Sequence, residues 1–190
     1  MTQDKDFKRA VREYALRTGR SYASARRILS SRSRGGAAME SLAFKLISKQ
    51  EAGFAVRVPE GWSEFPPVLS HSPYEVARFA YRDHTDHLCI VFRLPGSPGL
   101  DPRGTAARSQ AALTKKGFGN FALTKADVGS RAGVRLTFDK PTETGVWASR
   151  EYFVTAGSLV YCLGLASGDP EGDAETFDAV AAQFQITTAT

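Results

Sequence analysis

Hydrophobic residues from about position 42 onward fall in short runs in which every second side chain is apolar. In the run 88–94, for example, Leu88, Ile90 and Phe92 share one face of an extended chain. A period of two is typical of a β-strand with one buried face, and residues that favour turns separate the runs. This part of the chain is therefore predicted to consist mainly of β-sheet.

The same pattern sets the predicted order of elements. Strands are predicted at 54–58, 76–82, 87–94, 121–126, 132–139, 146–155 and 159–166. Helices are predicted at 105–116, ending at Gly117, and in a final segment capped by Asp173 that contains Phe177, Val180 and Phe184. Because short turns join most neighbours, the economical fold is α+β: a central antiparallel sheet flanked by helices, as an α/β/α sandwich.

The N-terminal segment has helical periodicity instead. Residues 4–17 place Phe7, Val11 and Tyr14 on one face, and Gly19 suits the left-handed conformation that ends a helix. A second apolar stripe begins at Tyr22, and small polar residues with the composition of a flexible linker follow it. The predicted organisation is a basic helical hairpin at 1–32, a linker at 33–41 and an α+β domain at 42–190.

Charge is concentrated in residues 1–36, which we call the basic arm. The 190-residue chain has a net charge of +5, but the basic arm alone holds ten Lys or Arg and three acids, or +7, and the remainder carries −2. This asymmetry predicts contact between the arm and an anionic partner. The predicted contact residues are Arg20, Arg26, Arg27, Arg32 and Arg34.

Three interpretations of these arginines stay open. Guanidinium groups match phosphate oxygens and release counterions, so the arm is suited to DNA or RNA phosphates. The same residues are suited to an acidic protein surface. In the third interpretation they form only the solvated face of two amphipathic helices, and helix pairs with a glycine in the turn are common outside DNA-binding proteins.

Residues 54–62, with the sequence FAVRVPEGW, and residues 151–163 resemble the opening strand and a late hairpin of the PsbP/Mog-like fold family. Residues 177–184 are similar to its closing helix, and the resemblance spans about 44–187. It implies an accessory protein that binds a larger partner, with no established enzyme activity. Residues 14–27 resemble a short helical module at the start of many actinobacterial cytosolic proteins.

Candidate chemistry is sparse. The segment 83–87, with the sequence DHTDH, offers four potential metal ligands, but zinc needs convergent ligands, and a polar turn explains it adequately. Cys89 and Cys162 lie in apolar runs, where a reduced thiol acts as a small hydrophobe. The aromatic residues Trp62, Phe79, Tyr81 and Trp147 are suited to a pocket, although sheet aromatics more often pack the core. No cofactor, metal or catalytic residue is predicted.

The expected location is the cytoplasm, because no apolar run approaches the roughly 20 residues that cross a bilayer and the N-terminus lacks an apolar leader. The favoured function is a non-enzymatic accessory protein that binds a protein partner and whose basic arm adds an electrostatic contact. The alternative is a nucleic-acid-associated protein whose hairpin contacts phosphates. A hydrolase or metal enzyme using the histidines of the 83–87 turn is the least favoured hypothesis.

Overall fold

The chain divides into two compact units in a computed structural model that describes residues 7–9, 11–13, 22, 43–81, 84–96, 101–143, 145–170 and 172–187. The first unit comprises 1–43 with 141–146, and the second, here called the body, comprises 44–140 with 147–190. In the first unit, 7–9 and 11–13 are helical, with Val11 fully buried and its charged neighbours exposed, as the apolar spacing predicts. The remainder of the predicted hairpin, except Tyr22, lies outside the described residues.

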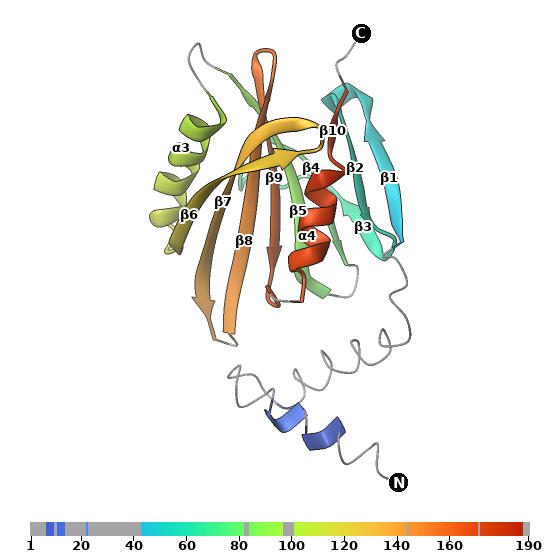
Figure 1. The fold of residues 1–190 in the computed structure, drawn as a ribbon, viewed down its shortest axis with the longest axis vertical. Coiled ribbons are helices and arrows are strands. Elements are labelled where there is room, and N and C mark those ends of the chain that lie inside the picture. The colour runs from blue at the N-terminus through green and yellow to red at the C-terminus, as the bar shows by residue number, and fades with distance from the viewer. Residues whose placement is uncertain are drawn as a thin grey trace. The chain divides into compact units, whose positions relative to one another are not determined.

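The body follows the predicted order of strands, helix, four strands and helix (Figure 1). The first strands are β1 (Phe44–Lys49), β2 (Phe54–Pro59), β3 (Trp62–Phe65), β4 (Glu75–Tyr81) and β5 (His84–Pro95), with a short 3-10 helix η1 (Gln50–Ala52). They are followed by α3 (Pro102–Thr114), β6 (Gly119–Val128), β7 (Arg131–Thr142), β8 (Gly145–Ala156), β9 (Leu159–Ser167), α4 (Ala174–Ala182) and β10 (Gln185–Ile186).

These strands form two sheets. The larger sheet has seven strands in the order β3-β4-β5-β9-β8-β7-β6, and the smaller has three in the order β1-β2-β10. Hairpin neighbours such as β4 and β5, and long-range neighbours such as β5 and β9, pair antiparallel. The α+β class with a central antiparallel sheet is thereby confirmed.

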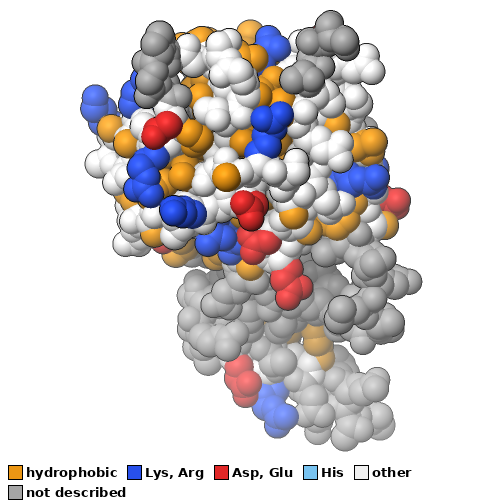
Figure 2. Space-filling view, turned by 45° about the horizontal axis from the view of Figure 1, so that its top comes forward, with side chains coloured by type: hydrophobic (Ala, Val, Ile, Leu, Met, Phe, Trp, Pro, Cys, Tyr) orange, Lys and Arg blue, Asp and Glu red, His pale blue; other side chains and the backbone are white. Residues whose placement is uncertain are grey.

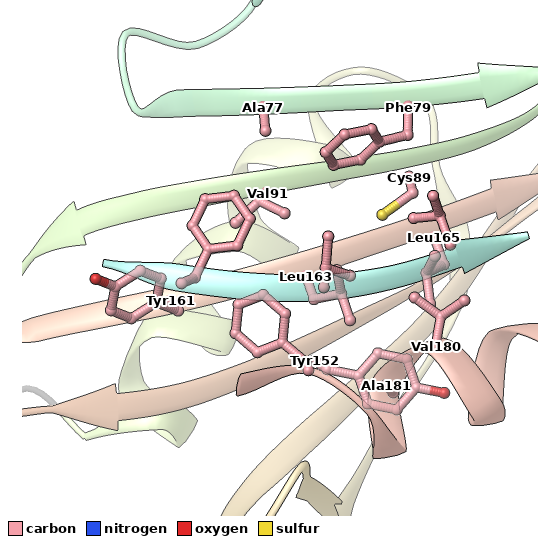
Figure 3. Close-up of a cluster of buried hydrophobic side chains, with 14 of the residues drawn as sticks. Ala77, Phe79, Cys89, Val91, Tyr152, Tyr161, Leu163, Leu165, Val180 and Ala181 are labelled. Carbon is pink, nitrogen blue, oxygen red and sulfur yellow. The ribbon is translucent and has the colours of Figure 1, made fainter. Parts of the chain in front are cut away.

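The two faces of the large sheet are covered by different elements. Along β9, Val160 and Cys162 pack in a cluster with Ala106 of α3. Leu163 and Leu165, at odd-numbered positions of the same strand, pack in a second cluster with Val180 of α4 and with β2 (Figure 3). Because successive side chains of a strand point to opposite faces, α3 covers one face, while α4 and the small sheet cover the other.

Three short strands, β1, β3 and β10, are not predicted from the pattern, and some boundaries differ. Helix α3 begins at Pro102, where the Asp101 carboxylate accepts the Gly104 N–H at 2.6 Å, and β5 begins at His84, inside the predicted turn. Phe184 lies beyond the end of α4 but is buried in the core. Among the described residues, no helix has the length and apolar composition needed to cross a bilayer.

The turn between β6 and β7 contacts the C-terminal segment closely. Gly129 has a φ of +57°, and its N–H donates to the Ala181 carbonyl at 2.9 Å. A Cβ at this position would lie 2.0 Å from the Phe184 carbonyl oxygen. Gly157, in the turn between β8 and β9, has the same φ but no atom within 4 Å of such a Cβ.

We therefore expect Gly129→Ala to be far more destabilising than Gly157→Ala. The left-handed φ costs about 1 kcal/mol at both positions, and only Gly129→Ala adds a clash with the backbone. Chemical denaturation should show a loss of unfolding free energy of about 1 kcal/mol for Gly157→Ala and at least about 3 kcal/mol for Gly129→Ala. Equal losses would show that the C-terminal segment moves aside without cost.

Candidate functional site

The predicted anionic contact lies in the basic arm. Arg20, Arg26, Arg27, Arg32 and Arg34 are all outside the described residues. Their role in binding an anionic partner stays a prediction.

The 83–87 turn was considered for metal binding and catalysis. Of its five residues, only His87 has a side chain that the structure describes. Its Nδ1 lies 2.6 Å from the Asp173 carboxylate, and the buried Ser167 hydroxyl donates to the same carboxylate oxygen. A serine–histidine–aspartate relay needs serine and carboxylate on different ring nitrogens, whereas the Ser167 Oγ lies 3.5 Å from Nδ1. This cluster therefore joins β5 and β9 to the start of α4.

The described residues form neither a metal site nor a reactive thiol site. No group of three or more His, Cys, Asp or Glu side chains among the described residues is placed to hold a metal ion. Cys89 and Cys162 are buried and are not disulfide-bonded, and burial raises the pKa of both thiols. A neutral, inaccessible thiol is a poor nucleophile, so both cysteines serve as packing groups. Figure 3 shows the Cys89 sulfur inside the core beside Phe79 and Leu165.

The four aromatic residues considered for a pocket do not come together in the structure. Phe79 and Trp62 are buried in the core, as the more common behaviour of sheet aromatics predicts. Tyr81 is 41% exposed and Trp147 is half-buried. These four side chains therefore do not share one environment.

A partly buried carboxyl group lies between α3 and the large sheet. Glu151 of β8 accepts a hydrogen bond from the Ser109 hydroxyl of α3 at 2.6 Å. Burial raises the pKa of Glu151 to about 7, although the Ser109 hydrogen bond and the Lys116 charge both act to lower it. The glycine opposite on β9, Gly164, leaves room for this side chain. The arrangement attaches α3 to the sheet at a polar point.

The feature that sequence reasoning missed is the segment Pro66–Tyr74 between β3 and β4, here called the Leu69 loop. It exposes Leu69 by 63% and Tyr74 by 42%, and three prolines are exposed with them: Pro66, Pro67 and Pro73. Scattered apolar residues on a surface are ordinary, but several on one loop are typical of a contact site.

The loop is held in one conformation by a buried carboxylate at its end. Glu75, only 3% exposed, accepts the Val68 N–H at 3.1 Å. Its two oxygens also accept Arg78 Nε at 2.7 Å and Arg78 Nη2 at 2.9 Å. Within the loop, the His71 N–H donates to the Val68 carbonyl at 2.9 Å. A bidentate arginine pair adds both geometric precision and energy.

This arrangement presents apolar side chains on a rigid frame. A loop that is already ordered loses little conformational entropy when it binds, so its exposed side chains favour association. In the sequence, the one indication of this loop is the set of three prolines around Leu69. The bond between Glu75 and Arg78 is not indicated, because residues three apart in a strand normally point to opposite faces. A register irregularity between Glu75 and Ala77 interrupts that alternation, which explains why the Glu75–Arg78 bond was not predicted.

Solved structures with the same fold are found at low sequence identity. The solution structure of CyanoP, the PsbP of Synechocystis sp. PCC 6803, is similar with a TM-score of 0.61 and 14% identity over 80% of this chain and 96% of that one. The Ran-binding protein Mog1p of Saccharomyces cerevisiae has a TM-score of 0.53 and 11% identity over 77% and 96%. LpqN of Mycobacterium tuberculosis, involved in cell envelope biogenesis, has a TM-score of 0.50 and 18% identity over 76% and 91%.

The body therefore has a PsbP/Mog-like fold, which confirms the resemblance found in residues 54–62, 151–163 and 177–184. No protein-family model and no curated protein sequence matches the chain. At these identities the likeness establishes the fold, and function has to be argued from the residues themselves.

Removing the Glu75 carboxylate should release the Leu69 loop. In Glu75→Ala the Arg78 guanidinium loses its partner, and we expect a loss of about 3 kcal/mol in unfolding free energy together with faster amide hydrogen exchange at Val68 and His71. The control is Glu64→Ala on β3, which removes an exposed pair with Lys49 and should cost less than about 1 kcal/mol. Unchanged exchange in Glu75→Ala would contradict the proposed frame.

Protonation of Glu151 should make stability pH-dependent. The pKa of about 7 in the folded protein exceeds the ordinary value of 4.5, so the folded state binds the proton more tightly and loses stability as pH rises from 4.5 to 7. We expect Glu151→Gln to be more stable than wild type at pH 8, by up to about 3 kcal/mol, and equal to it near pH 4. Denaturation curves at several pH values measure this. The exposed Glu175→Gln on α4 is the control, and a Glu151→Gln curve parallel to wild type would contradict the assignment.

Proposed function

We propose that this protein is a non-enzymatic accessory protein whose Leu69 loop binds a protein partner. The observation that carries the proposal is the combination of a 63% exposed Leu69 with a buried Glu75 carboxylate that holds the loop in place. An apolar side chain on a pre-organised loop contributes to binding without a large cost in ordering.

The other polar clusters of the body support a binding role rather than catalysis. The Asp173 carboxylate bonds to Ser167 and His87, and Glu151 bonds to Ser109, so each of these groups has a structural task. A protein of the same fold, Mog1p, is named for binding Ran, which supports protein binding as a use of this architecture.

The basic arm adds an electrostatic contact in this proposal. Its charge of +7 suits an anionic region of the partner, through Arg20, Arg26, Arg27, Arg32 and Arg34. Charged contacts of this kind raise the rate of encounter more than the final affinity. The cytoplasmic location stays a prediction from the N-terminal sequence.

The second candidate function is association with nucleic acid, and the charge of the basic arm is the observation that favours it. In that case the helical hairpin contacts DNA or RNA phosphates, and the body serves another purpose. Binding would then fall steeply with salt concentration and would disappear with the five arginines.

Partner isolation with surface variants of the full chain tests the proposal. We expect a nuclease-resistant protein to be recovered from native cell extract with wild type and lost with Leu69→Ser/Tyr74→Ser. The matched control is Leu46→Ser, which removes a leucine that is 53% exposed on β1 and should retain the partner.

Two other outcomes would overturn the proposal. Recovery of the same protein with Leu69→Ser/Tyr74→Ser would show that the Leu69 loop is not the contact. Recovery of nucleic acid alone, lost when the five arginines are changed to glutamine, would establish the second candidate function.

A further inference from the structure

Charge in the body is divided sharply along the chain, although the chain outside the basic arm carries only −2 in total. Residues 101–126 contain five Lys or Arg and one acid, whereas residues 127–190 contain four Lys or Arg and nine acids. The basic segment consists of α3 and β6, the outermost strand of the large sheet on that side. A basic region therefore lies within an otherwise acidic body.

Helix α3 turns its basic side chains to solvent. Thr105 and Ala106 are buried against the sheet, and Ser109 and Leu113 are partly buried on the same side. We call the opposite side the α3 basic face. Its members are all exposed: Arg103 and Arg108 on the helix and Lys115 and Lys116 just beyond its last residue, with Ala107, Ala111, Ala112 and Thr114 between them. On the left of Figure 2, where α3 lies, Lys and Arg side chains are interspersed with hydrophobic ones.

Three cations of this face form no ion pair within the part of the body that the structure describes. No ion pair there joins Arg103, Arg108 or Lys115 to a carboxylate. Lys140 of β7 adds a further cation at the end of α3, because its Nζ donates to the Lys116 carbonyl at 3.1 Å and lies 5.5 Å from the Phe118 ring centre.

Three acids near the two helices, Asp101, Asp173 and Asp178, are engaged. The Asp101 carboxylate caps α3, the Asp173 carboxylate bonds to Ser167 and His87, and Asp178 accepts from Arg150 at 2.8 Å and from the Tyr152 hydroxyl at 2.8 Å. Acids already bonded within the chain are poor partners for the α3 basic face of a second copy, so these three do not supply its complementary charge.

We infer that the α3 basic face docks an acidic surface of a partner protein. Arg108 and Lys115 lie two helical turns apart, about 10 Å, and the residues exposed between them are small: Ala111, Ala112 and Thr114. Small apolar side chains let a second backbone approach closely while the flanking cations pair with its carboxylates. Helix α3 carries no aromatic residue on which a base can stack, so single-stranded nucleic acid fits this surface less well.

A small anion is also a poorer fit. The cleft of about 520 Å³ at the N-terminal end of α3 is lined by Arg103 and Lys125 but also by Asp101 and Asp127, so its charges balance. The extended face along the helix, rather than this cleft, is where positive charge is in excess.

This inference does not depend on the Leu69 loop. The loop joins β3 and β4 at one edge of the large sheet, and α3 packs beside β6 at the other edge. Variants of Leu69 and Tyr74 leave the α3 basic face intact, so the two proposals fail separately.

The test uses the full chain with Arg20, Arg26, Arg27, Arg32 and Arg34 changed to glutamine, so that the basic arm does not dominate binding. Poly-L-glutamate and a duplex DNA of equal total charge are the two probes, titrated at an ionic strength of about 0.05 M. We expect this protein to bind poly-L-glutamate, and the further change Arg108→Gln/Lys115→Gln to weaken that binding about tenfold. The matched control, Lys45→Gln/Arg57→Gln on β1 and β2, removes the same charge and should change binding less than about twofold.

Three outcomes would overturn the proposal. Equal effects of the Arg108→Gln/Lys115→Gln pair and the control pair would show that net charge alone matters. Tighter binding to duplex DNA, lost with Arg108→Gln/Lys115→Gln, would assign the face to nucleic acid. A dimer in light scattering that Arg108→Gln/Lys115→Gln dissociates would assign it to a second copy of the chain.

Discussion

The burial of both faces of β9 is the constraint on which the other elements depend. Seven of its nine residues are buried, and Val160 and Cys162 pack in the cluster with α3 while Tyr161, Leu163 and Leu165 pack in the cluster with α4 and β2. Full burial of one leucine or valine side chain contributes roughly 1.5–3 kcal/mol, so leaving either face of this strand in water is costly. Helix α3 must cover one face, and α4 with the small sheet must cover the other. The three layers follow from this single strand.

Much of this architecture can be predicted from the chain because the buried strands have strong patterns. The run Leu159–Ala166 is apolar almost throughout, as expected for a strand with two buried faces, and Gly157 marks the turn before it. The strands β3 and β10 were not predicted because four and two residues are too few to show a period of two, and in β1 the adjacent Leu46 and Ile47 interrupt that period. Asp173 lies at the predicted cap position, yet its side chain bonds to Ser167 and His87 instead.

The candidate surfaces were less predictable than the fold, for two different physical reasons. The Leu69 loop depends on a hydrogen-bond network around Glu75, which lies beside an irregularity in the pairing of β4 with β5. The α3 basic face is not visible in the net charge of the body, because the acids of residues 127–190 cancel its positive charge in that sum. In the folded body, most of those acids lie away from the exposed side of α3, although Glu151 and Asp127 lie near the helix. Net charge describes the whole molecule, while binding depends on each surface.

In the Leu69 loop, the residues that fix the backbone differ from the residues that are exposed. Glu75, Arg78 and the Val68 backbone set the course of the chain, whereas Leu69 and Tyr74 project outward. Substitutions at the two outward positions therefore alter the exposed surface of the loop at little cost to folding. In evolution, such a loop can change its surface chemistry while the fold remains intact.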